Sequence, residues 1–221
     1  MKLTLADIAE ARAYERERPA LRARIQELRD RRRVHLGPLV SVAFESRETV
    51  RYQVQEMVRA ERILHDRGVQ AELDAYNPLI PGAGRLSATL FIECTRDDQL
   101  REWLPKLVGI ERHLELRIGD MRVSSIPEAG HAAQLTRPDV TAAVHYLVID
   151  VGVALKGTVA IVSEVSGVSE VSGVSGVSAL PGVADALEMG PAWIALTHPE
   201  YREVAELRAL TRTELAGDLR G

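Results

Sequence analysis

The sequence predicts an α+β fold: a mainly antiparallel sheet with helices packed on it, a helical arm at the N-terminus and a low-complexity insertion late in the chain. The chain has 221 residues, of which 46% are hydrophobic and 27% charged, so it can form a sizeable core. Short segments of alternating apolar and polar residues, typical of half-buried antiparallel strands, recur between segments with helical periodicity. We expect an arm at residues 1–33, an α+β domain at 34–151 and 191–221, and the insertion at 156–190.

The predicted arm begins with Thr4 as a helix N-cap and an aspartate three residues later as its capping-box partner. Pro19 should then end or kink the helix, or start a second one. Between residues 12 and 33 there are nine arginines against four acidic residues. This excess indicates either a contact for phosphates or an acidic partner, or a solvated helix with pairs four residues apart such as Glu27 and Arg31.

After the arm the pattern changes to that of strands. Residues 39–44 and 49–54 are expected to pair as a hairpin across a short polar turn, because both segments have strand character. An amphipathic helix follows from Val54 and ends at Gly68. Alternation then predicts another strand at 69–76.

The later elements follow the same two periodicities. We expect a strand at 86–94, a helix from Asp97, a hairpin of 111–118 with 121–126, strands at 140–151, 192–196 and 201–205, and a last helix capped by Thr211. Residues 162–178 repeat Val-Ser-Gly or Val-Ser-Glu with a period of three. This period matches neither a strand nor an α-helix, so we interpret the tract as a surface loop.

Composition argues against several classes of protein. Aromatic residues make up 4% of the chain and the net charge is −4, which argues against a stacking surface or a broad basic surface for nucleic acid. Cys94 is the single cysteine and lies in an apolar run, so we expect a buried, inert thiol. No apolar run approaches the ~20 residues of a membrane span. We therefore expect a cytoplasmic protein without a membrane partner, and the composition argues against a nucleic-acid partner while leaving a local basic patch open.

Glu61 and His65 interrupt the apolar face of the predicted helix. Because they are four residues apart, both side chains can reach one point, as in a helical half-site for iron or another divalent metal. Glu61 is also a candidate general base. The structural alternative is a buried glutamate paired with an arginine. Further metal ligands would come from across the sheet, from Glu56, Glu93, Glu111, His113 or His145.

A second candidate site is the polar group formed by Arg51, Gln53, Gln55 and Arg59, where the predicted strand meets the helix. A helix N-terminus presents free N–H groups, so this group predicts either an anion-binding site or a polar face exposed to water. The loop at 77–85 carries two large aliphatic residues between prolines. It should either dock a partner or fold back over the end of the sheet.

Seven short motifs, spread over nearly the whole chain except the valine–serine tract, form one recognisable pattern. They are MKLTLADI (1–8), GPLV (37–40), QVQEMVRAE (53–61), AYNPLIP (75–81), LSAT (86–89), AVHYL (143–147) and HPEY (198–201). In these motifs the chain resembles the bacterial family called domain of unknown function 3501, which is uncharacterised. Glu56, Tyr76, Asn77 and His145, which lie in these motifs, are further candidate binding residues.

Members of that family look like companions of rubrerythrin-like proteins and of iron–sulfur proteins related to heterodisulfide reductase subunits. The resemblance therefore implies an accessory or binding protein in an iron-dependent redox or oxidative-stress system. Two alternatives stay open. One is a metal- or carboxylate-dependent enzyme that uses Glu61 and His65, and the other is RNA binding through the arginine-rich arm.

Overall fold

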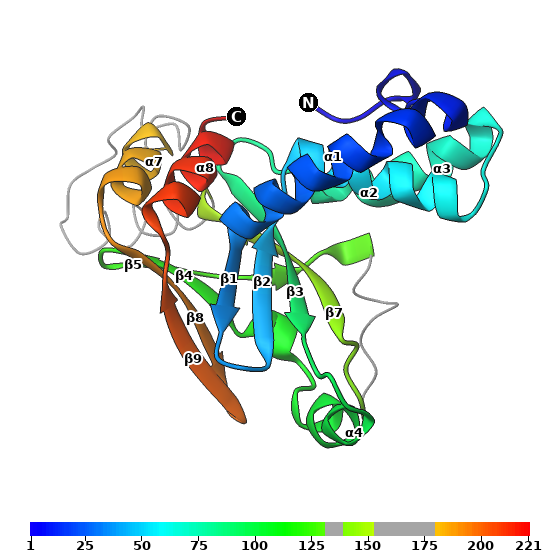
Figure 1. Cartoon of the computed structure of the whole chain (residues 1–221). Coiled ribbons are helices and arrows are strands. Elements are labelled where there is room, and N and C mark those ends of the chain that lie inside the picture. The colour runs from blue at the N-terminus through cyan, green and yellow to red at the C-terminus, as the bar shows by residue number, and fades with distance from the viewer. Residues whose placement is uncertain (131–138, 153–179) are drawn as a thin grey trace.

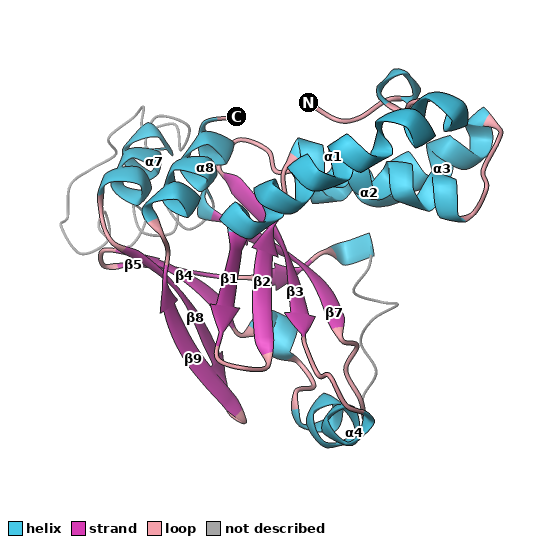
Figure 2. Ribbon diagram, viewed as in Figure 1, coloured by secondary structure: helices cyan, strands magenta, loops and turns pink. Residues whose placement is uncertain are grey.

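The computed structural model describes residues 1–130, 139–152 and 180–221, and its strands form two antiparallel sheets (Figure 2). Sheet A has the order β1–β2–β3–β7–β6, with β1 Arg33–Leu36, β2 Val40–Phe44, β3 Arg85–Ile92, β7 Val144–Asp150 and β6 Ile126–Pro127. Sheet B has the order β5–β4–β8–β9, with β5 Met121–Ser124, β4 Leu114–Ile118, β8 Ala192–His198 and β9 Tyr201–Glu206. The predicted α+β fold with antiparallel pairing is confirmed, with two sheets instead of one.

One hydrophobic core contains the inner faces of both sheets. Successive side chains of a strand point to opposite faces, so alternate residues are buried in this core, as Leu86 and Leu90 of β3 and Leu116 of β4 show. The opposite, outer face of sheet A carries hydroxyl-bearing residues such as Thr89 and Tyr146, which lie side by side on β3 and β7. Sheet A therefore has an apolar inner face and a mixed outer face.

The turn between β1 and β2 joins the two sheets. Gly37 has a φ of +65°, and a Cβ atom at this position would lie 2.5 Å from the hydroxyl oxygen of Tyr201. That hydroxyl donates a hydrogen bond to the carbonyl of Leu36 at 2.8 Å and accepts one from the N–H of Leu39 at 3.2 Å. Glycine is required here by both the backbone conformation and the close approach of β9.

Helices cover the ends of the sheets (Figure 1). Three of them, α1 Ala11–Arg32, α2 Arg47–Ala60 and α3 Asp66–Tyr76, lie together at one end of sheet A. The pair α7 Leu180–Met189 and α8 Ala209–Arg220 lies beside them, and α4 Asp97–Lys106 lies at the opposite end. Short 3-10 turns occur at Leu5–Asp7, Asn77–Leu79 and Ile110–Arg112. No helix in the described parts of the chain is long and apolar enough to cross a membrane.

The predicted hairpin of residues 39–44 with 49–54 is wrong, because 49–54 belong to α2. Ser46 caps this helix, and Thr49 completes the capping box. The apparent alternation arose because two faces of the helix are buried: Val50 and Val54 on one, and Tyr52 against α1 on the other. Strand β2 pairs instead with β1 and β3.

The strand predicted at 69–76 is also wrong, since these residues are in α3. His65 caps that helix, so Gly68 lies in its first turn and does not end a preceding helix. The strands predicted at 86–94, 140–151, 192–196 and 201–205 correspond to β3, β7, β8 and β9, and the second predicted hairpin corresponds to β4 and β5. These predictions are confirmed.

Helix α1 is continuous through Pro19, so neither the predicted helix end nor the predicted start of a second helix occurs there. Tyr14 on one side of the proline and Ile25 and Leu28 on the other are buried, so tertiary packing compensates for the hydrogen bond that proline cannot donate. The arginines of α1 pair mainly with other elements and not along the helix. Arg31, for example, lies 3.6 Å from Glu214 of α8.

The end of the chain differs from the prediction in two places. Helix α8 begins at Ala209, so Thr211 lies inside it and donates a hydrogen bond to the carbonyl of Arg31. Residues 180–189 of the predicted insertion form α7, which buries Ala184 and contacts α8. The valine–serine tract at 162–178 lies outside the described residues.

Arg32, at the end of α1, is 1% exposed and joins three segments of the chain. Its guanidinium donates to the backbone carbonyls of Phe44 at 3.0 Å and Glu45 at 2.8 Å, where β2 leads into α2. It also pairs with Glu214 at 3.2 Å and with Asp218, both on α8. Burial raises the pKa of Asp218, and the guanidinium acts against this shift.

Replacing Arg32 with methionine should destabilise the fold by about 3–5 kcal/mol, because it leaves two partly buried carboxylates and two backbone carbonyls without their cation. Urea denaturation followed by circular dichroism measures this loss. Arg22→Met on the exposed side of the same helix is the control, and it should change stability by less than about 0.5 kcal/mol. Equal stability of the two variants would contradict the joining role of Arg32.

Candidate functional site

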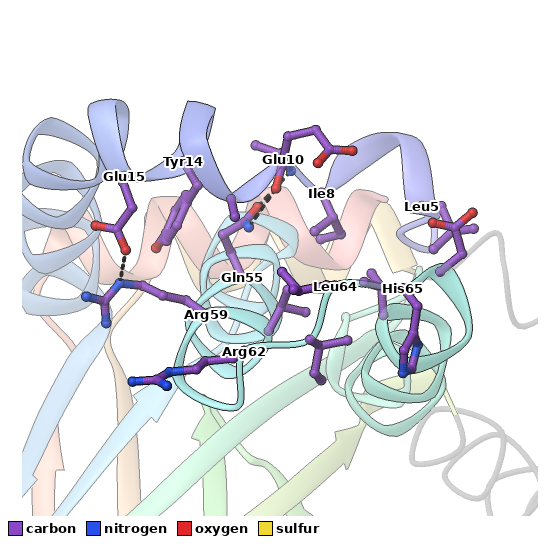
Figure 3. Close-up of a pocket in the computed structure, with 16 residues that line it drawn as sticks. Leu5, Ile8, Glu10, Tyr14, Glu15, Gln55, Arg59, Arg62, Leu64 and His65 are labelled. Carbon is purple, nitrogen blue, oxygen red and sulfur yellow. Dashed lines mark hydrogen bonds and ion pairs between the residues drawn. The ribbon is translucent and has the colours of Figure 1, made fainter.

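The candidate site is a cavity of about 350 Å³ between the N-terminal segment, the last turns of α2 and the α2–α3 turn (Figure 3). We call it the N-terminal groove. Its lining residues are Leu5, Ile8, Ala9, Glu10, Ala11, Tyr14, Glu15, Gln55, Val58, Arg59, Arg62, Ile63, Leu64, His65, Asp66 and Val69. Aliphatic side chains line its interior and charged side chains surround them, so it combines apolar contact with charge.

Two buried side-chain amides hold the N-terminal segment in place. Gln55 accepts a hydrogen bond from the N–H of Ala9 at 2.8 Å and donates one to the carbonyl of Ala9 at 3.0 Å (Figure 3). Asn77 makes the same pair of bonds to Leu3, at 2.8 and 3.0 Å. Each amide thus satisfies the backbone of a segment that has no strand partner. Gln55 and Asn77, predicted as binding residues, bind the chain's own N-terminus.

An ion-pair network fixes α1 against α2 beside the groove. The Tyr14 hydroxyl donates to Glu56 at 2.5 Å, and Arg18 donates two hydrogen bonds to the same carboxylate, both at 2.8 Å. The Arg18 guanidinium is the main cause that lowers the pKa of Glu56 to about 2. Arg59 pairs with Glu15 at 2.6 Å across the groove (Figure 3).

The end of α2 explains why the predicted longer helix does not form. The N–H of Ile63 bonds to the carbonyl of Val58 at 2.9 Å, and the N–H of Arg62 bonds to that of Arg59 at 3.2 Å. This pattern is a Schellman motif, with Arg62 at a φ of +54° in the position that usually holds glycine. The spacing of Val58 and Ile63, which pack together, was the sequence signal for this ending. It was missed because no glycine marks it.

The structure separates Glu61 from His65. Glu61 is the C-cap of α2 and His65 the N-cap of α3, and both are exposed. The His65 ring nitrogen Nδ1 accepts a hydrogen bond from the N–H of Gly68 at 2.9 Å. Across the described ranges there is no group of three or more His, Cys, Asp or Glu residues that could hold a metal. The metal half-site therefore loses the helical geometry on which it was predicted, and metal binding stays a prediction.

The further metal ligands suggested by the sequence are dispersed among different partners. Glu93 pairs with Arg33 at 2.6 Å on the outer face of sheet A. Glu111 and His145 are both buried, with 3.9 Å between the nearest carboxylate and imidazole atoms. Burial lowers the pKa of His145. The ring of His113 lies edge-on to that of His198, with 5.0 Å between centroids.

The other predicted binding residues are divided among several places. Arg51 donates to the backbone carbonyl of Asp7 at 2.7 Å, so it too holds the N-terminal segment. Gln53 and Tyr76 line a separate pocket on the outer face of sheet A. Leu79, in the loop between prolines, is buried, which agrees with folding back and not with docking a partner. Cys94 is partly buried, and burial raises the pKa of its thiol.

Comparison with known proteins gives a family and a structural relative. Residues 2–169 match the family described as "Protein of unknown function (DUF3501)". The chain is also similar to a crystal structure described as a novel protein of unknown function from Burkholderia pseudomallei K96243. The two are 32% identical, with a TM-score of 0.78 over 99% of this chain and 100% of the other. No curated protein matches.

Replacing Gln55 with leucine should release the N-terminal segment, because the backbone of Ala9 loses both partners. Hydrogen exchange of residues 2–10 should accelerate about tenfold, while β3 keeps its protection. Gln70→Leu is the control, since Gln70 is exposed and bonds to Asp74 on its own helix. Unchanged exchange in Gln55→Leu would show that other contacts hold the segment.

Replacing Glu56 with glutamine should reduce the loss of stability in acid. The folded-state pKa of Glu56 is about 2, against an ordinary value of 4.5, so its contribution is complete above pH 4.5 and is lost as the pH falls towards 2. Denaturant titrations across this interval should show a shallower decline than in wild type. The control is Glu17→Gln, at an exposed site on α1. Parallel declines in all three proteins would contradict the prediction.

Proposed function

We propose that this chain, which belongs to the DUF3501 family of proteins of unknown function, is a binding protein whose N-terminal groove docks an acidic, aliphatic segment of a partner protein. The α2–α3 turn carries this proposal. Leu64 is 85% exposed there, beside the aliphatic interior of the groove. An aliphatic side chain exposed at the mouth of an apolar groove favours contact with another protein.

The cation of Arg62 is the reason for proposing an acidic partner segment. This arginine is exposed, and no carboxylate within the described residues lies at ion-pair distance from it. Its left-handed backbone costs of order 1 kcal/mol, which glycine would avoid. Strain of this kind is common at functional sites. A cation retained in a strained position beside an exposed leucine is complementary to a segment with one aliphatic and one acidic side chain.

Several polar groups of the groove are already engaged with other parts of the chain, which favours binding over catalysis. Gln55 is occupied by the backbone of Ala9, Tyr14 by Glu56, and Arg59 by Glu15. A general acid or base needs a proton that can move to or from a substrate. Side chains already committed to holding the fold are poorly placed for that task.

We further propose that the partner is a rubrerythrin-like or iron–sulfur redox protein of the cytoplasm. The family resemblance supports this partner class. The described residues offer no three-residue metal group, so the redox centre in this proposal belongs to the partner. This chain would then act as an accessory protein that recognises the partner's surface.

The substitution Arg62→Gly tests the backbone strain and the charge of this position by their opposite expected effects on stability and on binding. Glycine relieves the left-handed backbone, so the variant should be more stable by about 1 kcal/mol. It also removes the cation, so recovery of the partner should fall about tenfold, as for loss of a central charged contact. The measurement is affinity purification from native cells through a C-terminal tag, with quantitative mass spectrometry, alongside a urea titration.

Leu64→Asp tests the apolar half of the contact and should reduce recovery by a similar factor. Matched controls are Leu210→Asp on α8 and Arg101→Gly on α4, both at exposed positions away from the groove. The proposal requires a redox protein that is lost with Arg62→Gly and Leu64→Asp and kept with both controls. Recovery of no redox protein, or equal recovery with all variants, would overturn it.

A further inference from the structure

A second cavity, of about 240 Å³, lies on the outer face of sheet A, and we call it the sheet-face pocket. Its floor is a row of neighbouring residues on three strands: Ala43 on β2, Thr89 on β3 and Tyr146 on β7. Side chains of α1, α2 and α3 form its walls. The volume equals that of about eight water molecules in the liquid, enough for one small organic molecule.

Glu45 forms the negative end of this pocket. Its two carboxylate oxygens accept hydrogen bonds from the hydroxyls of Thr49 at 2.5 Å and Thr89 at 2.6 Å. These two bonds fix the orientation of the carboxylate, and each oxygen keeps a lone pair for another donor. Within the described residues no arginine, lysine or histidine pairs with this carboxylate. Glu45 is thus an oriented anion whose charge has no partner from the protein.

Arg29 forms the positive end. Its guanidinium lies over the ring of Tyr52, with 5.5 Å to the ring centroid. In the described part of the chain no carboxylate lies within ion-pair distance of it. Arg33, the other arginine of the pocket, is instead held by Glu93 at 2.6 Å and lies over the ring of Phe91. Arg29 therefore retains donors that can form a paired contact with a carboxylate.

Two tyrosines, Tyr76 and Tyr146, line the same pocket as the two charges. Tyr146 is hydrogen-bonded to Tyr76, which is hydrogen-bonded to Gln53. Burial is the main cause that raises the pKa of Tyr146 to about 12, and the charges of Glu45 and Arg29 act on it in opposite directions. Both charged groups are therefore close to this hydroxyl, although they do not pair with each other.

We propose that the sheet-face pocket binds a small zwitterionic amino acid, with its carboxylate on Arg29 and its ammonium group on Glu45. These two opposite charges line one cavity and pair with no other charged group of the described residues, so a single zwitterion would be complementary to both. A ligand with one charge would leave the other group of the protein unpaired. This site involves different residues from the N-terminal groove and does not depend on the function proposed for it.

The test uses the full chain and isothermal titration calorimetry with zwitterions of increasing length: alanine, 4-aminobutyrate, 5-aminopentanoate and 6-aminohexanoate. The single-charge analogues are butylamine and butanoate, with longer homologues matched to the best zwitterion. At least one zwitterion should bind at least tenfold more tightly than both of its analogues. If no zwitterion binds, or if an analogue binds equally well, the proposal is wrong.

Variants assign the two ends of the ligand. Arg29→Gln should remove the preference for the zwitterion over the amine, and Glu45→Gln should remove its preference over the carboxylate. Arg29→Lys should keep part of the preference for the zwitterion over the amine. That result would show that Arg29→Gln acts by removing the charge and not by disturbing the fold. Arg22→Gln, on the same helix and outside the pocket, should bind like wild type. Unaltered preferences in both pocket variants would overturn the assignment.

Discussion

The guanidinium of Arg32 is the contact through which the main parts of the fold meet. It holds together the end of α1, the β2–α2 junction and α8, the last of which lies 182 residues further along the chain. A buried cation requires several acceptors at once, because each unmet donor retains its desolvation cost. The three segments must therefore be in place together for any one of them to be stable. This requirement sets where α2 begins, and α2 in turn positions both candidate sites.

Buried polar side chains solve a second problem at the N-terminus. Residues 1–10 form neither a strand nor a long helix, so their backbone groups need other partners. Gln55 and Asn77 each supply a donor and an acceptor to one backbone residue, and Arg51 bonds to a third. The segment can then lie across α2 and α3 and leave an apolar groove beneath it. The groove is a consequence of amide geometry more than of hydrophobic packing.

The sequence predicted the fold where one periodicity dominated and failed where two overlapped. Strand β3 keeps its aliphatic residues Leu86, Leu90 and Ile92 on one face, and it was predicted correctly as a strand. Residues 49–54 form a helix that buries Val50 and Val54 on one side and Tyr52 on another. Two buried helix faces therefore produced the same alternation of apolar and polar residues as a strand. For the candidate site, the sequence analysis singled out part of the stretch that lines the N-terminal groove but not its geometry. The left-handed Arg62 ends α2 early and separates Glu61 from His65, and no composition rule signals this, since arginine rarely takes that conformation.

Helix α2 lies between the two cavities, with Gln55 and Val58 facing the groove and Val50 and Gln53 facing the sheet-face pocket. Coupling between the two would require that α2 have two arrangements which a ligand could select. Its start is fixed by the Ser46 cap and by the contacts of Arg32, and its end by the Schellman motif. Its central valines are fully buried, and packed interiors do not deform gradually. Ligand binding on one side of α2 should therefore leave the other side unchanged. We expect the two sites to bind their ligands independently, although both are positioned by the same rigid helix.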